Sequence, residues 1–184
     1  MIETTTNNKI YLQIFDKAIR VFTGFMVAIY GLAKPFQFSY IKEYIGDEVI
    51  SELTGMQLMW YFFGYSSIVP ITIGVFQVIG SIFLLFNKTK LIGIAMLLPI
   101  LFNIVLFDLV YEVNLGATIY GIIFLIFLLL SAAIDFKRII IVFKSLITYT
   151  HDYSKKETIT IWVLGIFFGI LIFFFFQLLL NYNH

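Results

Sequence analysis

Five polar side chains interrupt the long apolar runs of this sequence, and their types and spacing point to chemistry: Lys34, Gln77, Asn103, Asp108 and Glu112. A charged side chain at the centre of a bilayer costs about 2.5–3.5 kcal/mol on insertion scales, so such residues usually face protein and mark ligand or proton sites. The sequence offers no nucleophile–base set, metal-ligand spacing or phosphate loop beside them. We therefore expect ligand binding, with no catalytic residue in this chain alone.

The depth of these residues can be estimated from helical geometry. Lys34 lies ~21 Å along a helix from Arg20, and Asp108 lies ~26 Å from the start of its own apolar run. Glu112 follows Asp108 by one turn, so Lys34, Asp108 and Glu112 are predicted to meet at one membrane level, with Gln77 and Asn103 below them. Two interpretations stay open, namely a ligand or proton site and a set of structural ion pairs and interhelical hydrogen bonds.

A second set of residues is predicted to hold helices together. At the opposite membrane level, Arg20 is expected to pair with Asp16 or Asp135 as a structural ion pair. Small residues allow helices to approach closely, which predicts helix packing through glycines. For Gly165 and Gly169, docking within the chain and dimerisation both remain open. The packing candidates are Gly24, Gly31, Gly74, Gly165 and Gly169.

The composition requires a bilayer as solvent. Of the 184 residues, 61% are hydrophobic and 12% are charged, against roughly 45–50% and 25% in soluble domains. The net charge of +1 gives no reason to expect a nucleic-acid partner. The chain has no cysteine, and its two histidines, His151 and His184, lie outside the apolar runs. We therefore expect no haem, Fe–S cluster or metal site.

Five apolar stretches approach the roughly 20 residues that a membrane-spanning helix needs. Ten of the 12 Lys and Arg residues fall on one side of these spans and one falls on the other. The positive-inside rule then places the N-terminus in the cytoplasm and the C-terminus outside. The predicted spans are about 17–38, 67–86, 91–111, 117–134 and 159–180.

Two further stretches are predicted to lie in the membrane surface. Residues 47–65 are interpreted as an outer interfacial helix, and the alternative is a single long helix over 57–86 kinked at Pro70. Residues 136–158 form a basic cytoplasmic segment whose amphipathic part suits anionic lipid headgroups or a docking partner. The predicted organisation is therefore a core over 1–135, this basic segment, and a final span within 159–184.

Two short motifs carry a family resemblance. They are Arg20-x3-Gly24-x6-Gly31-x2-Lys34 and Gly74-x2-Gln77-x2-Gly80, the latter followed by Asn87-Lys88-Thr89-Lys90. Over about 17–135 they resemble the DoxX-like family of small bacterial membrane proteins. This resemblance implies a four-helix bundle and a link to quinone-coupled sulfur oxidation or membrane oxidoreductase complexes. The family commonly has Glu where this chain has Gln77, which cannot ionise.

Together these observations predict an all-α integral membrane bundle, with a four-helix DoxX-like core and a fifth transmembrane helix, in the bacterial inner membrane. The predicted function is that of a non-catalytic accessory subunit of a larger complex, with a protein partner or a second copy. A quinone or another lipophilic small molecule is the candidate ligand. A small transporter or channel and a scaffold that docks a membrane partner are the alternatives.

Overall fold

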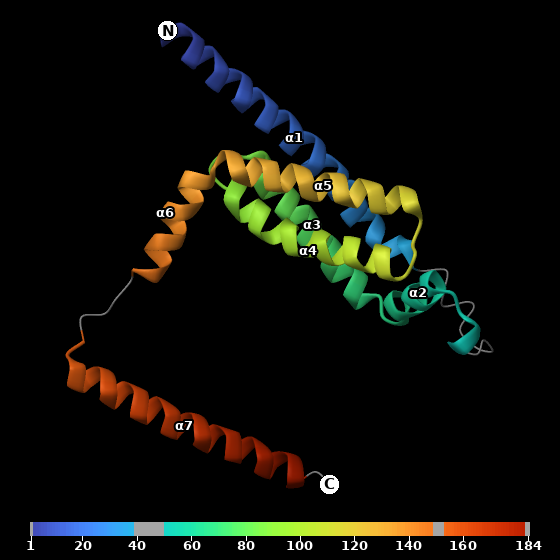
Figure 1. Cartoon of the computed structure of the whole chain (residues 1–184). Coiled ribbons are helices and arrows are strands. Elements are labelled where there is room, and N and C mark those ends of the chain that lie inside the picture. The colour runs from blue at the N-terminus through green and yellow to red at the C-terminus, as the bar shows by residue number, and fades with distance from the viewer. Residues whose placement is uncertain (1, 39–49, 149–152, 183–184) are drawn as a thin grey trace. The chain divides into compact units, whose positions relative to one another are not determined.

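The computed structural model describes residues 2–38, 50–148 and 153–182, and every regular element in these ranges is helical (Figure 1). The all-α prediction is confirmed. The chain divides into two compact units, Met1–Ile140 and Ile141–His184. The helices are α1 (Ile2–Gln37), η2 (Ile50–Glu52), α2 (Gly55–Tyr65), α3 (Ile68–Leu85), α4 (Lys90–Val110), α5 (Leu115–Ile134), α6 (Phe136–Ile147) and α7 (Lys155–Tyr182).

Four helices of the described ranges are long and apolar enough to cross a membrane: α3, α4, α5 and the Lys155–Phe175 part of α7. They lie at four of the five predicted spans and indicate a multi-pass protein in contact with a bilayer. The remaining predicted span, 17–38, overlaps α1 over residues 17–37; α1 begins 15 residues earlier, at Ile2, and is more polar than the four candidate spans. A crossing by α1 and the orientation of the chain stay predictions.

The stretch 57–86 forms two helices and not one kinked helix. Thr54 caps the start of α2, because its side chain accepts a hydrogen bond from the Gln57 N–H and the Gln57 side chain accepts one from the Thr54 N–H. Ser66 then has extended backbone (φ −133°, ψ 124°), which ends α2. Pro70 lies in the first turn of α3, where a missing N–H is harmless. Residues 47–49 of the predicted interfacial segment lie outside the described residues.

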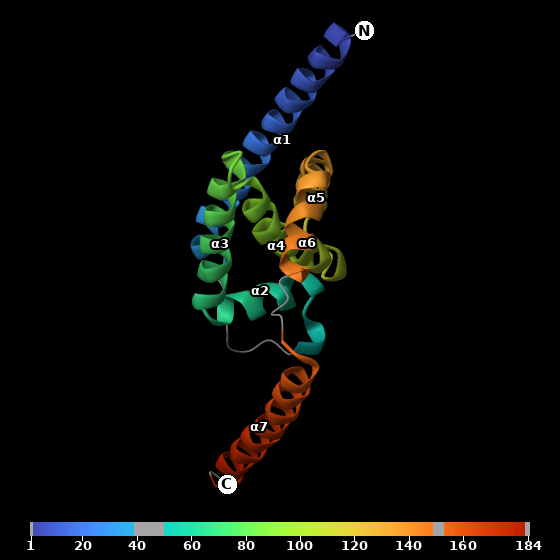
Figure 2. The same ribbon diagram turned by 90° about the vertical axis from the view of Figure 1, so that its left-hand side faces the viewer.

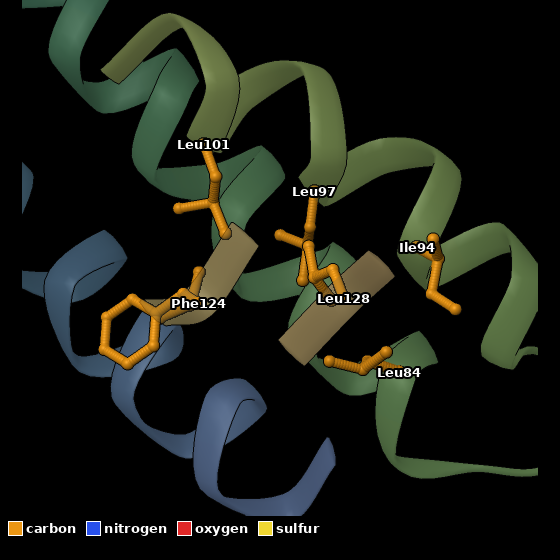
Figure 3. Close-up of a cluster of buried hydrophobic side chains, with 7 residues drawn as sticks. Leu84, Ile94, Leu97, Leu101, Phe124 and Leu128 are labelled. Carbon is orange, nitrogen blue, oxygen red and sulfur yellow. The ribbon is translucent and has the colours of Figure 1, made fainter. Parts of the chain in front are cut away.

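The bundle consists of α1, α3, α4 and α5, each packed against two of the others in a closed ring (Figure 2). Their facing side chains form one buried apolar cluster (Figure 3). The outward faces carry large exposed apolar side chains, such as Phe25, Phe102 and Leu129, which is the surface that a bilayer would cover. The buried cluster comprises Val27, Leu84, Ile94, Leu97, Leu101, Phe124 and Leu128.

Neither α6 nor α7 buries a described side chain. A Cβ added to Gly165 or Gly169 would find no heavy atom within 4 Å. The predicted close packing of this glycine pair against another helix therefore stays a prediction.

Candidate functional site

A cavity of about 260 Å³ lies among the four bundle helices at the end that α2 covers. We name it the α2 cavity. Three of the predicted ligand-binding residues, Lys34, Gln77 and Asp108, line it. Its remaining wall is largely aromatic and aliphatic, and the aromatic residues are Tyr30, Trp60, Tyr120 and Phe124.

Aromatic contacts hold α2 over this end of the bundle. The Phe38 ring meets the Trp60 ring edge to face at 5.2 Å and stacks on Phe63 at 5.4 Å. Phe63 in turn meets Phe107 of α4 at 5.9 Å. Such ring pairs contribute about 0.5–1.5 kcal/mol each beyond their buried area. These contacts position α2 so that Trp60 lies in the wall of the α2 cavity.

Close packing of α1 on α3 brings Lys34 and Gln77 to one side of the cavity. A Cβ added to Gly31 would lie 2.8 Å from the Gly74 carbonyl oxygen, and one added to Gly74 would meet the Gly31 carbonyl oxygen. No larger residue fits at this crossing without a shift of the helices. The predicted packing glycines Gly24, Gly31 and Gly74 all lie between α1 and α3.

The polar atoms of the cavity are only partly paired. Gln77 is 1% exposed, yet no described residue donates a hydrogen bond to its Oε1, and none accepts one from the buried Trp60 Nε1. The Lys34 ammonium donates to Gln37 Oε1 at 3.0 Å and lies 5.4 Å from the centre of the Phe38 ring. An unpaired buried polar group costs about 1–3 kcal/mol, which a hydrogen bond to a bound molecule would recover.

Lys34 and Asp108 share the cavity without forming a salt bridge. Both also line a second, smaller cavity of about 40 Å³, together with Phe38, Phe63 and Phe107. Asp108 is 9% exposed, and its carboxylate makes no salt bridge with another described residue. Its backbone carbonyl oxygen accepts a hydrogen bond from the Val113 N–H at 3.0 Å. The Lys34 ammonium and the Asp108 carboxylate therefore line the same cavity without a salt bridge between them.

Asn103 and Glu112 do not join this site, contrary to the sequence-based expectation. The buried face of α4 includes Leu101, Val105 and Asp108. Asn103 lies two residues from Leu101 and from Val105, or about 200° around the helix, so its side chain is exposed. Its amide instead donates to the Pro99 carbonyl oxygen at 2.8 Å. Glu112 is exposed beyond the end of α4, with φ 51°.

A charged cluster holds the bundle together at its opposite end. Asp16 pairs with Arg20 at 3.0 Å and with Lys90 at 2.9 Å, and it accepts a hydrogen bond from Ser131 Oγ at 2.6 Å. One carboxylate thereby joins α1, α4 and α5. Arg20 also donates to the Leu84 carbonyl oxygen and to Asn87 Oδ1, which ties in the end of α3.

The sequence suggested Asp16 and Asp135 as partners of Arg20, and in the structure Arg20 pairs with Asp16. Asp135, at the end of α5, pairs with Lys90 at 3.2 Å. In the sequence, Lys90 stood out only as part of the Asn87-Lys88-Thr89-Lys90 motif, with no ion pair expected for it, whereas in the structure it is 3% exposed and paired. A signal was present, because Lys90 directly precedes an apolar run and Asp135 directly follows one.

Comparisons with known proteins give one distant relationship. No model of a protein family matches the chain, and no solved structure matches it. The chain is 30% identical over 95 residues to "Uncharacterized protein YwoB" of Bacillus subtilis (strain 168), a match that covers 52% of this chain. The match spans 61% of the relative's own length. This similarity indicates distant homology and assigns no activity, so the DoxX-like resemblance stays a prediction.

Proposed function

We propose that this chain is a non-catalytic accessory subunit of a bacterial inner-membrane complex, and that it holds a quinone or a similar lipophilic ring compound in the α2 cavity. The observation that carries the proposal is that the α2 cavity combines an aromatic lining with buried polar atoms that make no hydrogen bond to a described residue. Among the residues that the structure describes, Gln77 Oε1 and Trp60 Nε1 lack hydrogen-bond partners, in a wall that also contains Tyr30, Tyr120 and Phe124. Apolar sites with a few convergent polar groups are typical of small-molecule binding.

The chemistry of the polar groups suits a quinone in both redox forms. The two carbonyl oxygens of a quinone need donors, and the Lys34 ammonium and the Trp60 indole N–H are donors. The hydroxyl groups of the reduced form need acceptors, and the Asp108 carboxylate and the Gln77 amide oxygen are acceptors. All four side chains line the same cavity.

The cavity volume limits the part of the ligand that it encloses. About 260 Å³ is just below the range of about 300–1,000 Å³ that drug-sized sites occupy. A single substituted ring fits this volume, and a long isoprenoid tail would have to remain among lipids. The chain has no Cys, haem motif or metal-ligand spacing, so electrons would be supplied by a partner protein or its cofactor.

The exposed final helix supports the subunit role and the alternative of a docking scaffold. Within the described residues of the unit Ile141–His184, every α7 side chain is exposed, and no heavy atom lies within 4 Å of a Cβ added to Gly165 or Gly169. Such a pair allows a second membrane helix to approach closely.

Native mass spectrometry of the protein, gently extracted from its own membrane, tests both parts of the proposal. We expect a co-purifying protein together with an added mass equal to that of a quinone. A bare monomer or homo-oligomer, free of any small molecule, would contradict the subunit role and bring the transporter alternative forward.

A further inference from the structure

A wide groove runs along α1 at the end of the bundle opposite to the α2 cavity. Its volume is about 1220 Å³, and we name it the basic groove. Figure 1 shows that the N-terminal part of α1 extends past the other bundle helices at this end. The charged residues that line the groove are Lys9, Asp16, Lys17, Arg20, Lys90, Asp135 and Arg138.

The groove has an excess of positive charge. Four charges at its base cancel, because the carboxylates of Asp16 and Asp135 pair with Arg20 and Lys90. Three further cations line the groove, and none of them makes a salt bridge within the described ranges: Lys9, Lys17 and Arg138. A net charge of about three positive units therefore faces the space beside α1.

Two of these cations are positioned by neutral carbonyl oxygens. Lys17 Nζ donates to the Leu85 carbonyl oxygen at 2.7 Å, and Arg138 donates to the carbonyl oxygens of Asn87 and Lys88 at 3.1 and 3.2 Å. An ammonium has three donors and a guanidinium has five, so both retain free donors for an anion. The carbonyl contacts fix the cations in place without neutralising them.

An apolar strip continues from these charges along α1. Val21, Phe22 and Phe25 line the same groove, and they are 45%, 45% and 64% exposed. Phe25 lies eight residues from Lys17, or ~12 Å along the helix. The groove thus presents a cationic end and an apolar end to one occupant, which is the pattern of an amphiphile with a negative head.

We propose that the basic groove binds an anionic phospholipid, with its phosphate between Lys17 and Arg138 and an acyl chain along Val21, Phe22 and Phe25. Three features support this occupant. The charge is complementary to a phosphate, and basic pockets between membrane helices are known sites for anionic headgroups. The volume exceeds the range of about 300–1,000 Å³ for drug-sized ligands. The neighbouring helices α3, α4 and α5 are candidate membrane spans, so membrane lipids would surround this part of the bundle.

Native mass spectrometry with defined lipids tests this proposal on the full chain in a neutral detergent. The probes are dioleoyl phosphatidylglycerol and dioleoyl phosphatidylcholine, which share their tails and differ in net charge. We expect at least about tenfold tighter binding of the anionic lipid. Because each cation near an anionic headgroup contributes about a fivefold effect, the variant Lys17→Gln/Arg138→Gln should lose roughly 25-fold in affinity.

Matched variants separate this site from general charge effects. The control Lys155→Gln/Lys156→Gln removes two exposed cations from the start of α7 and should bind the anionic lipid as the parent does. The exchange Lys17→Arg/Arg138→Lys keeps both charges and should retain most of the affinity. Should the double glutamine variant unfold, the single change Lys17→Gln at an exposed position should still cost about fivefold.

Three results would overturn the proposal. The first is equal affinity for the two lipids, and the second is an unchanged affinity in the double glutamine variant. The third is a mass adduct of inorganic phosphate that depends on Lys17 and Arg138 without any lipid binding, since that would assign the groove to a free anion.

Discussion

Gly31 of α1 and Gly74 of α3 face each other so closely that a Cβ on Gly31 would lie 2.8 Å from the Gly74 carbonyl oxygen. The same added Cβ would lie 3.0 Å from Gln77 Cβ, and one on Gly74 would lie 3.1 Å from Lys34 Cβ. The helix crossing and two residues of the α2 cavity therefore share one contact. Packing at the two glycines determines where the polar side chains of the cavity lie.

The first prediction concerns this crossing. Gly31→Ala or Gly74→Ala should destabilise the bundle by about 1–3 kcal/mol, because the added methyl group forces the helices apart. Gly165→Ala is the matched control, since no heavy atom lies within 4 Å of its added Cβ. Unfolding of the three variants in detergent measures the difference. An equal response at all three glycines would contradict the close approach.

The second prediction concerns Asp16. Asp16→Asn leaves the buried Arg20 and Lys90 without their shared carboxylate, and removing one partner of a buried ion pair costs about 3–5 kcal/mol. Asp135→Asn should cost less, because Lys90 keeps Asp16 and the Asp135 side chain is 29% exposed. Equilibrium unfolding of both variants provides the comparison. A larger loss for Asp135→Asn would show that Asp16 is not the centre of the cluster.

The third prediction is that a substitution at Gln77 has different effects on folding stability and on quinone affinity. Gln77→Leu removes a buried amide whose oxygen accepts no hydrogen bond within the described part of the chain, so the variant should be as stable as the parent or up to about 1 kcal/mol more stable. The same change should weaken quinone binding about tenfold or more. Asn103→Leu is the matched control, because that amide is exposed and should affect neither property. Thermal unfolding and a binding titration on each variant test the pair, and a destabilised Gln77→Leu protein would contradict the prediction.

The fourth prediction concerns topology. The chain has no cysteine, so single cysteines can be labelled without background. In spheroplasts, a membrane-impermeant maleimide should label Glu112→Cys, whereas Lys88→Cys and Lys155→Cys should react only after permeabilisation. Lys9→Cys should behave like Lys88→Cys if α1 crosses the membrane. Labelling of Lys9→Cys from outside would leave α3, α4, α5 and α7 as the spans.

The helices were largely readable from the sequence, because apolar run length is a strong local signal. The run predicted at 67–86 corresponds to α3 at Ile68–Leu85, and the run at 91–111 corresponds to α4 at Lys90–Val110. The start of α1 was not readable, since the polar residues before position 17 resemble a solvated tail although they continue the helix. The break at Ser66 was ambiguous for a different reason, because the apolar character of the sequence continues across it.

The contacts between side chains were harder to predict from the sequence, because they depend on how each helix is rotated about its own axis. Estimated depth predicted one level for Lys34 and Asp108, which both line the α2 cavity. Depth alone also admitted Asn103, whose position around α4 leaves its side chain exposed. The Asp16–Lys90 pair joins residues 74 positions apart and has no local signature. The contribution of Trp60 to the cavity depends on the docking of α2, which follows from tertiary aromatic contacts.

The central claim is that the α2 cavity binds a quinone, and tryptophan fluorescence tests it most directly. The chain has two tryptophans, Trp60 in the cavity wall and the exposed Trp162 of α7. In a Trp162→Phe variant, titration with a short-chain quinone should quench Trp60 emission saturably at one site. The converse Trp60→Phe variant should show only weak, linear quenching of Trp162. Linear quenching in both proteins would contradict the claim.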